Sequence, residues 1–179
     1  MRKSRGDFRR VYGGEMLRTT KILLVACLAF FYTLVVLNNT TDFDSNYEFV
    51  KHVLSMDTTF PGNHGMWRAL TGTGWHLAFY LGIIAWEAVT MVLLWWGAWK
   101  MLRARKGSVT AFGKAAEVAV AGMTLSLVMW LVAFLCVGGE WFLMWQSHIW
   151  NGQEAAFRNF AVVGLVLLFL VQPETDAQA

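Results

Sequence analysis

A histidine, a tyrosine and a glutamate fall on one face of an apolar stretch in the middle of the chain. Steps of four, seven and three residues separate His76, Tyr80, Glu87 and Thr90. An α-helix has 3.6 residues per turn, so all four side chains lie on one side of it. If this helix crosses a membrane, Glu87 lies roughly 16 Å deeper than His76, near the middle. We expect it to relay protons, to bind a ligand, or to hydrogen-bond a neighbouring helix as a neutral acid, because an unpaired carboxylate is costly there.

Histidines, methionines and acids also gather in the polar segments between the apolar runs. His52 and Met56 are four residues apart, and Glu140, Met144 and His148 are spaced four and four. Each set shares a face if its segment is helical. Histidine and thioether ligands suit a soft metal or a haem iron, so an outer-face redox or metal site is one alternative. No H-x-x-x-H, H-E-x-x-H or C-x-x-C-H motif is present, and we expect no metal, cofactor or catalytic residue.

The stretch "GGEWFLMWQSHIWNGQEAAFR", residues 138–158, combines aromatic, acidic and basic residues. Its two glycines permit a helix break or a close contact, and Asn151 can cap the helix that follows. Arg158 is expected to pair with Glu154 or Glu140, because an unpaired buried cation is costly. We interpret the outer polar residues as a cap that binds together with the buried acid. The candidate binding residues are His52, Asp57, His76, Glu87, Glu140, His148 and Arg158.

The composition indicates which elements position these residues. Hydrophobic residues make up 56% of the chain and charged residues only 15%, whereas soluble domains carry about 25% charged residues. A membrane-spanning helix needs about 20 apolar residues. Four such spans are predicted, at about 21–38, 75–102, 115–137 and 155–172. The chain is therefore predicted to be an all-α membrane protein, a four-transmembrane-helix bundle forming a single domain. No A-x-A-like cleavage site follows the first span, so we expect it to be a retained anchor.

Lysines and arginines predict how the bundle is oriented. Seven occur up to Lys21 and five between Lys100 and Lys114, whereas the other two connections hold three in total. Positively charged residues are retained on the cytoplasmic side. Both termini and the loop 103–114 are thus predicted to be cytoplasmic, and the loop 38–74 to lie outside. The net charge of +3 reflects this topology, and no nucleic-acid partner is expected.

The outer loop contains one segment with helical periodicity, "SNYEFVKHVLSM". Ser45 followed by Glu48 fits a capping box, and apolar residues recur at helical spacing through Leu54. A short amphipathic helix is expected here, on the membrane surface or across the mouth of the bundle. The tail "PETDAQA" is polar and is expected to be disordered.

Small residues form a stripe along the third span at steps of four, three and four, namely Ala115, Ala119, Gly122 and Ser126. Such stripes let helix backbones approach closely, so it is expected to face a neighbouring helix, a second copy of the chain or a larger membrane complex. Cys27 and Cys136 lie at depths that differ by roughly 20 Å. They are too far apart for a disulfide and are expected to be free.

Several blocks of the sequence resemble an uncharacterised prokaryotic family of predicted small integral membrane proteins, domain-of-unknown-function family 2165. The blocks are "TDFDSNYEFVKHVLSMDTTFP", "MWRAL", "HLAFYLGIIAWE" and "GGEWFLMWQSHIWNGQEAAFR", and the resemblance covers about residues 17–172. It implies a multi-pass protein of the bacterial inner membrane, surrounded by lipid. It implies no activity and no site residues.

These observations predict a non-enzymatic accessory, structural or regulatory component of the bacterial inner membrane. The small size, the stripe of small residues and the lack of a catalytic motif favour this interpretation. The first alternative is a small-molecule or lipid-binding or transport protein that uses Glu87 and the outer polar cap. The second alternative is the outer-face redox or metal protein.

Overall fold

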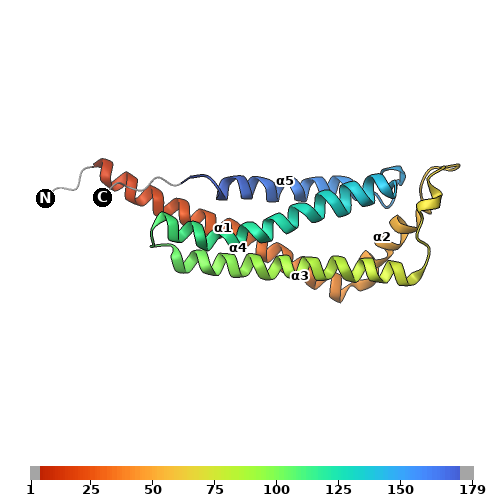
Figure 1. Ribbon diagram of the computed structural model, residues 1–179, viewed down its shortest axis with the longest axis horizontal. Helices are drawn as coiled ribbons and strands as arrows, with labels where there is room; N and C mark the ends of the chain where they lie inside the picture. Colours follow the sequence, from red (N-terminus) through yellow and green to blue (C-terminus); the bar gives the residue numbers. More distant parts are fainter. Residues whose placement is uncertain (1–4, 174–179) are drawn as a thin grey trace.

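The computed structural model describes residues 5–173, and side chains from residue 14 onward. Every regular element in this range is a helix (Figure 1). The elements are α1 (Arg5–Thr41), α2 (Phe43–Ser55), η1 (Met66–Arg68), α3 (Thr73–Ala104), α4 (Val109–Val128), the π-helix η2 (Met129–Trp141), η3 (Met144–Gln146) and α5 (Gln153–Leu170). The predicted disorder of the C-terminal tail concerns residues 174–179, which lie outside the described part of the chain.

Four helical stretches are long and apolar enough to cross a membrane. They are Gly14–Thr41, Thr73–Ala104, Val109–Trp141 and Gln153–Leu170. The short helix α2 lies in the connection between the first two. The predicted all-α, four-helix membrane bundle with a short helix in its first loop is confirmed.

The bundle is an elongated arrangement of four long helices with two distinct ends (Figure 1). Helix α3 packs against α1 and α4, while α5 packs against η2, α4 and α1. At the end that we call the basic end, α3 connects to α4 and α5 terminates. At the opposite end, which we call the α2 end, α1 leads into α2 and η2 leads toward α5.

Basic side chains of α1 hold the helix ends together at the basic end. Arg18 Nη1 donates to the carbonyl oxygens of Arg105 and Gly107, at 2.9 Å and 2.6 Å. The buried Lys21 donates from Nζ to the carbonyl of Gln172 at 2.8 Å. The carbonyls that end a helix lack partners within it and carry a partial negative charge. These cations therefore stabilise the ends of α3 and α5 against α1.

The connection between α3 and α4 is shorter than the predicted loop 103–114. Helix α3 continues through Ala104, and α4 already begins at Val109. Ser108 is the N-cap residue of α4, and its hydroxyl accepts a hydrogen bond from the backbone N–H of Ala111 at 3.2 Å. The serine starts the helix earlier than hydropathy suggested, because it satisfies a backbone donor that has no partner within the helix.

Helix α2 is amphipathic as predicted, but its predicted capping box is wrong. Helix α2 begins at Phe43, with Asp42 as its N-cap residue. Ser45 therefore lies inside the first turn, where its hydroxyl donates to Asp42 Oδ2 at 2.8 Å. The apolar face buries Val50, Val53 and Leu54, and the helix packs against α3 and α1. It thus lies across the mouth of the bundle.

The third membrane helix does not break at Gly138 and Gly139. It continues to Trp141 as the π-helix η2. A Cβ atom on Gly139 would lie 2.6 Å from Nε2 of Gln153, so this glycine allows the alternative that was predicted, a close contact. Leu143 then adopts φ 55°, the left-handed conformation, and ends the helical path. For this reason Glu140 and His148 do not lie on one helix.

The stripe of small residues on α4 packs inside the chain. Ala115, Ala119 and Ser126 are buried, and a Cβ atom on Gly97 of α3 would lie 2.6 Å from the backbone nitrogen of Ala119. Gly122 contacts α3 in the same way. The stripe is therefore packed against α3 and, at Ser126, against Tyr32 of α1, so its buried residues do not face a second copy or a larger complex. Cys27 and Cys136 are free, as predicted, and exposed.

Gly97→Ala is expected to destabilise the bundle by about 1–3 kcal/mol, because the added methyl group overpacks a helix contact. Gly82→Ala, on the same helix, is the control, since nothing lies within 4 Å of the position of its Cβ atom. Thermal unfolding in mild detergent measures both variants. Equal unfolding temperatures for the two would contradict the close approach of α3 and α4.

Candidate functional site

A cavity of about 330 Å³ reaches Glu87 from the α2 end of the bundle. Its walls come from α1, α2, α3, η2 and α5, so the four long helices and the short one all contribute. The lining residues are Val35, Asn38, Asn39, Asn46, Phe49, Val50, Tyr80, Ile83, Glu87, Trp130, Phe134, Gly152, Ala155 and Asn159. We call this space the Glu87 cavity. Its volume is within the range of small-molecule binding sites.

Glu87 is the acidic residue of this cavity and is 3% exposed. Its Oε2 accepts a hydrogen bond of 2.6 Å from Nδ2 of Asn39. Asn39 in turn forms hydrogen bonds with residues of α2 and α3. Its Oδ1 accepts from Nδ2 of Asn46 at 2.7 Å, and its backbone carbonyl accepts from the Tyr80 hydroxyl at 3.1 Å. These hydrogen bonds fix the position of the carboxyl group relative to α1, α2 and α3.

The second oxygen of Glu87, Oε1, faces the cavity. It receives no hydrogen bond from the described residues. In those residues, however, every side-chain nitrogen or oxygen atom that is fully shielded from solvent has a hydrogen-bond partner. Oε1 therefore lies on an accessible wall, and the cavity is the space that Glu87 lines. A carboxyl oxygen without a partner in an apolar surrounding is a strong site for a donor or a cation.

Trp130 forms a wall of the cavity and is held in place by a second buried polar network. Its indole N–H donates to the hydroxyl of Tyr32 at 2.9 Å. That hydroxyl also lies 2.5 Å from Oγ of Ser126. The network joins α1, α4 and η2, so the orientation of the indole depends on three helices.

A second, almost wholly apolar cavity of about 220 Å³ lies on the other side of one wall. The two cavities share Phe49, Val50, Ile83 and Phe134 as lining residues. The second cavity extends between α3 and η2, toward Trp86 and Val132. Only a layer of side chains thus separates the polar cavity from the apolar one.

The four residues at the spacing seen in the sequence are all buried on α3, which confirms their common face. They do not form one continuous relay. His76 donates from Nε2 to the carbonyl of Leu70 at 2.6 Å, and the hydroxyl of Ser55 lies 3.3 Å from the same nitrogen. It therefore fastens the loop that precedes α3, while Glu87 serves the cavity.

Two residues of the expected polar cap do come together. His52 Nδ1 lies 2.8 Å from an oxygen of Asp57, and its ring stacks on Trp150 with 4.8 Å between ring centroids. Glu48 lies beside this pair and accepts hydrogen bonds from Lys51. The Lys51 ammonium lowers the pKa of the Glu48 carboxyl below its usual range. On the side that faces solvent, this cluster holds α2 against the segment that precedes α5.

Besides His76, the three remaining cap residues do not join it. Glu140, His148 and Arg158 are exposed, and Arg158 forms no ion pair within the described residues, so the predicted pairing with Glu154 or Glu140 is absent. Arg68 instead reaches the backbone carbonyl of Glu140, at 3.5 Å. The pairing was expected for a buried guanidinium, but an exposed one gains little from an ion pair.

Metal-binding geometry is absent from the same region. No group of three or more histidine, cysteine, aspartate or glutamate side chains within residues 14–173 is placed to hold a metal ion. Met56, the expected partner of His52, is buried at the left-handed end of α2. The arrangement thus gives no support to the redox or metal alternative.

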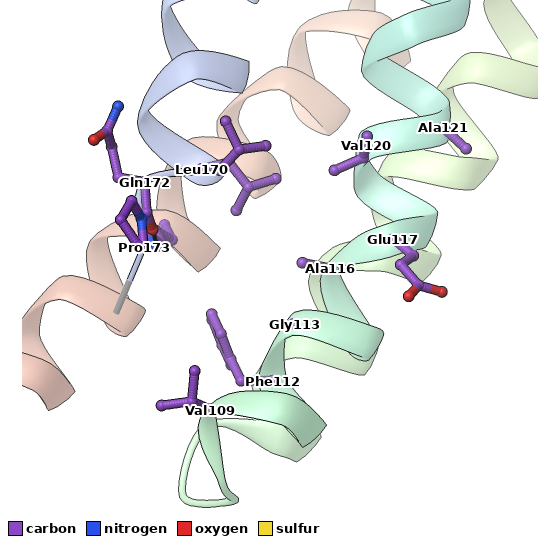
Figure 2. A pocket seen from close by; sticks show the side chains of 12 residues that line it. Val109, Phe112, Gly113, Ala116, Glu117, Val120, Ala121, Leu170, Gln172 and Pro173 are labelled. Carbon is purple, nitrogen blue, oxygen red and sulfur yellow. Dashed lines mark hydrogen bonds between the residues drawn. The ribbon is translucent and has the colours of Figure 1, made fainter. Parts of the chain in front are cut away.

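A further groove lies at the basic end, far from Glu87. It has a volume of about 500 Å³ and runs between α4 and α5, with Lys21 of α1 at its side. Figure 2 shows Phe112 and Leu170 projecting into it, whereas Glu117 points away. Its lining is mainly apolar, and Lys21 already bonds to Gln172. The chemistry of the bundle is therefore concentrated at the other end.

Asn39 and Tyr32 are not among the site residues that the sequence predicted. Asn39 falls where hydropathy ends the first span, whereas α1 continues to Thr41. Both residues are buried, and seven positions separate them. A spacing of seven places them on one helical face, and this was the available signal.

Comparison with known proteins adds a family but no activity. The family model described as "Predicted small integral membrane protein (DUF2165)" matches residues 17–173. No curated protein and no solved structure matches the chain.

Asn39→Ala is expected to lower stability by about 1–3 kcal/mol, because it leaves the buried Glu87 carboxyl without its donor. The neighbouring Asn38→Ala is the control: Asn38 also lines the cavity, but it is exposed and its side chain forms no hydrogen bond with the described residues. Thermal unfolding in detergent compares them. A loss as large for Asn38→Ala would show that the link to Glu87 is not the cause.

Proposed function

The chain belongs to the family of predicted small integral membrane proteins, DUF2165, and we propose that within the membrane it binds a small molecule in the Glu87 cavity. The observation that carries this proposal is the free oxygen of Glu87 on the wall of a partly open cavity between the membrane helices. Intramembrane acids that face a cavity mark binding sites or pathways. The cavity favours this function over an accessory role, which had drawn support from the stripe now found inside the bundle.

The bound molecule would reach the cavity from the α2 end. Helix α2 supplies Asn46, Phe49 and Val50 to the lining, and its contacts with α3 and α1 are fewer than those that join α3 to α1 and to α4. Elements with few buried contacts open most readily. A displacement of α2 would widen the entrance without disturbing the close packing of α3 on α4.

We infer a location in the bacterial inner membrane with both termini in the cytoplasm, and the distribution of charge supports this orientation. Lysines and arginines concentrate at the basic end, where Lys100, Arg103, Arg105 and Lys106 surround the α3–α4 connection. By the positive-inside rule this end faces the cytoplasm. The α2 end and the mouth of the Glu87 cavity would then face the outside.

Single cysteines in a variant without Cys27 and Cys136 test this orientation. Thr71→Cys, in the loop before α3, should react with a membrane-impermeant maleimide on intact cells. Lys106→Cys, in the α3–α4 connection, should react only after the membrane is opened. Both positions are exposed. The reverse labelling pattern would overturn the orientation.

Filling the cavity tests the proposed binding function. Ala155→Trp places an indole in the Glu87 cavity, and Ala116→Trp does the same in the groove at the basic end. Native mass spectrometry of protein extracted in mild detergent should show a bound small molecule in the wild type and in Ala116→Trp, and its loss in Ala155→Trp. An adduct that survives in Ala155→Trp, or no adduct in any of the three, would contradict binding in this cavity.

A further inference from the structure

The Glu87 cavity has a definite electrostatic character. Its lining contains one acid and no lysine, arginine or histidine among the residues described. The polar remainder consists of Asn38, Asn39, Asn46 and Asn159, which are neutral, together with the Tyr80 hydroxyl and the Trp130 indole. A negative charge on Glu87 therefore has no fixed positive partner within the cavity. Either a proton or a positively charged ligand must balance it.

Aromatic side chains occupy much of the remaining wall. Phe49, Tyr80, Trp130 and Phe134 come from α2, α3 and η2. Trp130 and Phe134 pack together with 4.7 Å between ring centroids, and Trp130 is fixed by its bond to Tyr32. Aromatic faces attract ammonium groups, most strongly where water is excluded.

We propose that the ligand of the Glu87 cavity is an organic ammonium ion with an apolar body, an inference that rests on the binding function proposed above. The ammonium group meets Glu87 Oε1, and the aromatic side chains surround it. The apolar body lies against Val50 and Ile83, which belong to the layer behind which the second cavity begins. That apolar space of about 220 Å³ accommodates a longer body if the side chains of this layer move aside.

Three probes of similar size and different charge test this assignment. They are 2-phenylethylamine, which is an ammonium ion at neutral pH, the neutral 2-phenylethanol and the anionic phenylacetate. Isothermal titration calorimetry of the protein in lipid nanodiscs, with empty nanodiscs to subtract partitioning, gives each affinity. The ammonium probe should bind roughly tenfold or more tightly than the alcohol, because a desolvated cation–π and carboxylate site favours the cation by at least that factor. Phenylacetate should not bind measurably.

Matched variants assign the preference to the cavity. Glu87→Gln should bring the affinities for the ammonium probe and the alcohol to within about threefold of each other, whereas Glu117→Gln, at an exposed position on α4, should retain the preference. Thermal unfolding checks that both variants fold. If Glu87→Gln does not fold, Phe134→Leu replaces it. This variant removes one ring, and should weaken binding of the ammonium probe severalfold without weakening that of the alcohol.

The outcomes separate the ligand class from the binding function. If the alcohol or the acid binds as tightly as the ammonium probe, and Ala155→Trp abolishes that binding, the cavity is a binding site and the ammonium assignment is wrong. An ammonium preference that persists in Glu87→Gln also overturns the assignment. If no probe binds and Ala155→Trp leaves the native adduct unchanged, the binding function fails as well.

Discussion

The hydrogen bond from Asn39 to Glu87 joins the end of α1 to the middle of α3 through two buried side chains. Around it, the Tyr80 hydroxyl and Asn46 bind to the same asparagine. One residue thereby connects three helices. The geometry satisfies only one oxygen of the carboxyl group, so the other remains on the cavity wall. The same interaction holds the helices together and leaves a reactive position open.

Helix packing differs between the two ends of the bundle, and the polar networks follow that difference. Toward the basic end α3 and α4 approach so closely that Gly97 has room for no side chain against Ala119. Toward the α2 end Figure 1 shows α3 diverging from the helix formed by α4 and η2, with α2 between them. Protein interiors do not tolerate large voids without cost. Helix α2 fills most of this gap, and the two cavities occupy what it leaves.

This arrangement separates two groups of polar residues that look alike in sequence. His52 and Asp57 bond to each other where they can be reached by solvent, and they stabilise α2 and its following turn. Glu87 is buried, has one neutral partner and faces an aromatic wall. Charge in the first group is screened by water, whereas charge in the second must be compensated within the membrane. The buried acid is therefore the side chain on which the proposed binding depends, and the outer cluster supports the helix that covers it.

Hydropathy, charge and spacing in the sequence were sufficient to predict the four spans, the amphipathic helix and the buried face of α3 that carries His76 and Glu87. These features depend only on local periodicity and on transfer into an apolar solvent. The partners of that face could not be deduced in this way. Asn39 lies 48 positions from Glu87, and the exposure of Arg158 depends on how α5 packs. Likewise the stripe on α4 could have faced a second copy equally well, since a small residue specifies close approach without specifying the approaching helix. Only the packing of the helices selected α3 for the stripe, Asn39 for the carboxyl group, and a cavity for the oxygen that remained.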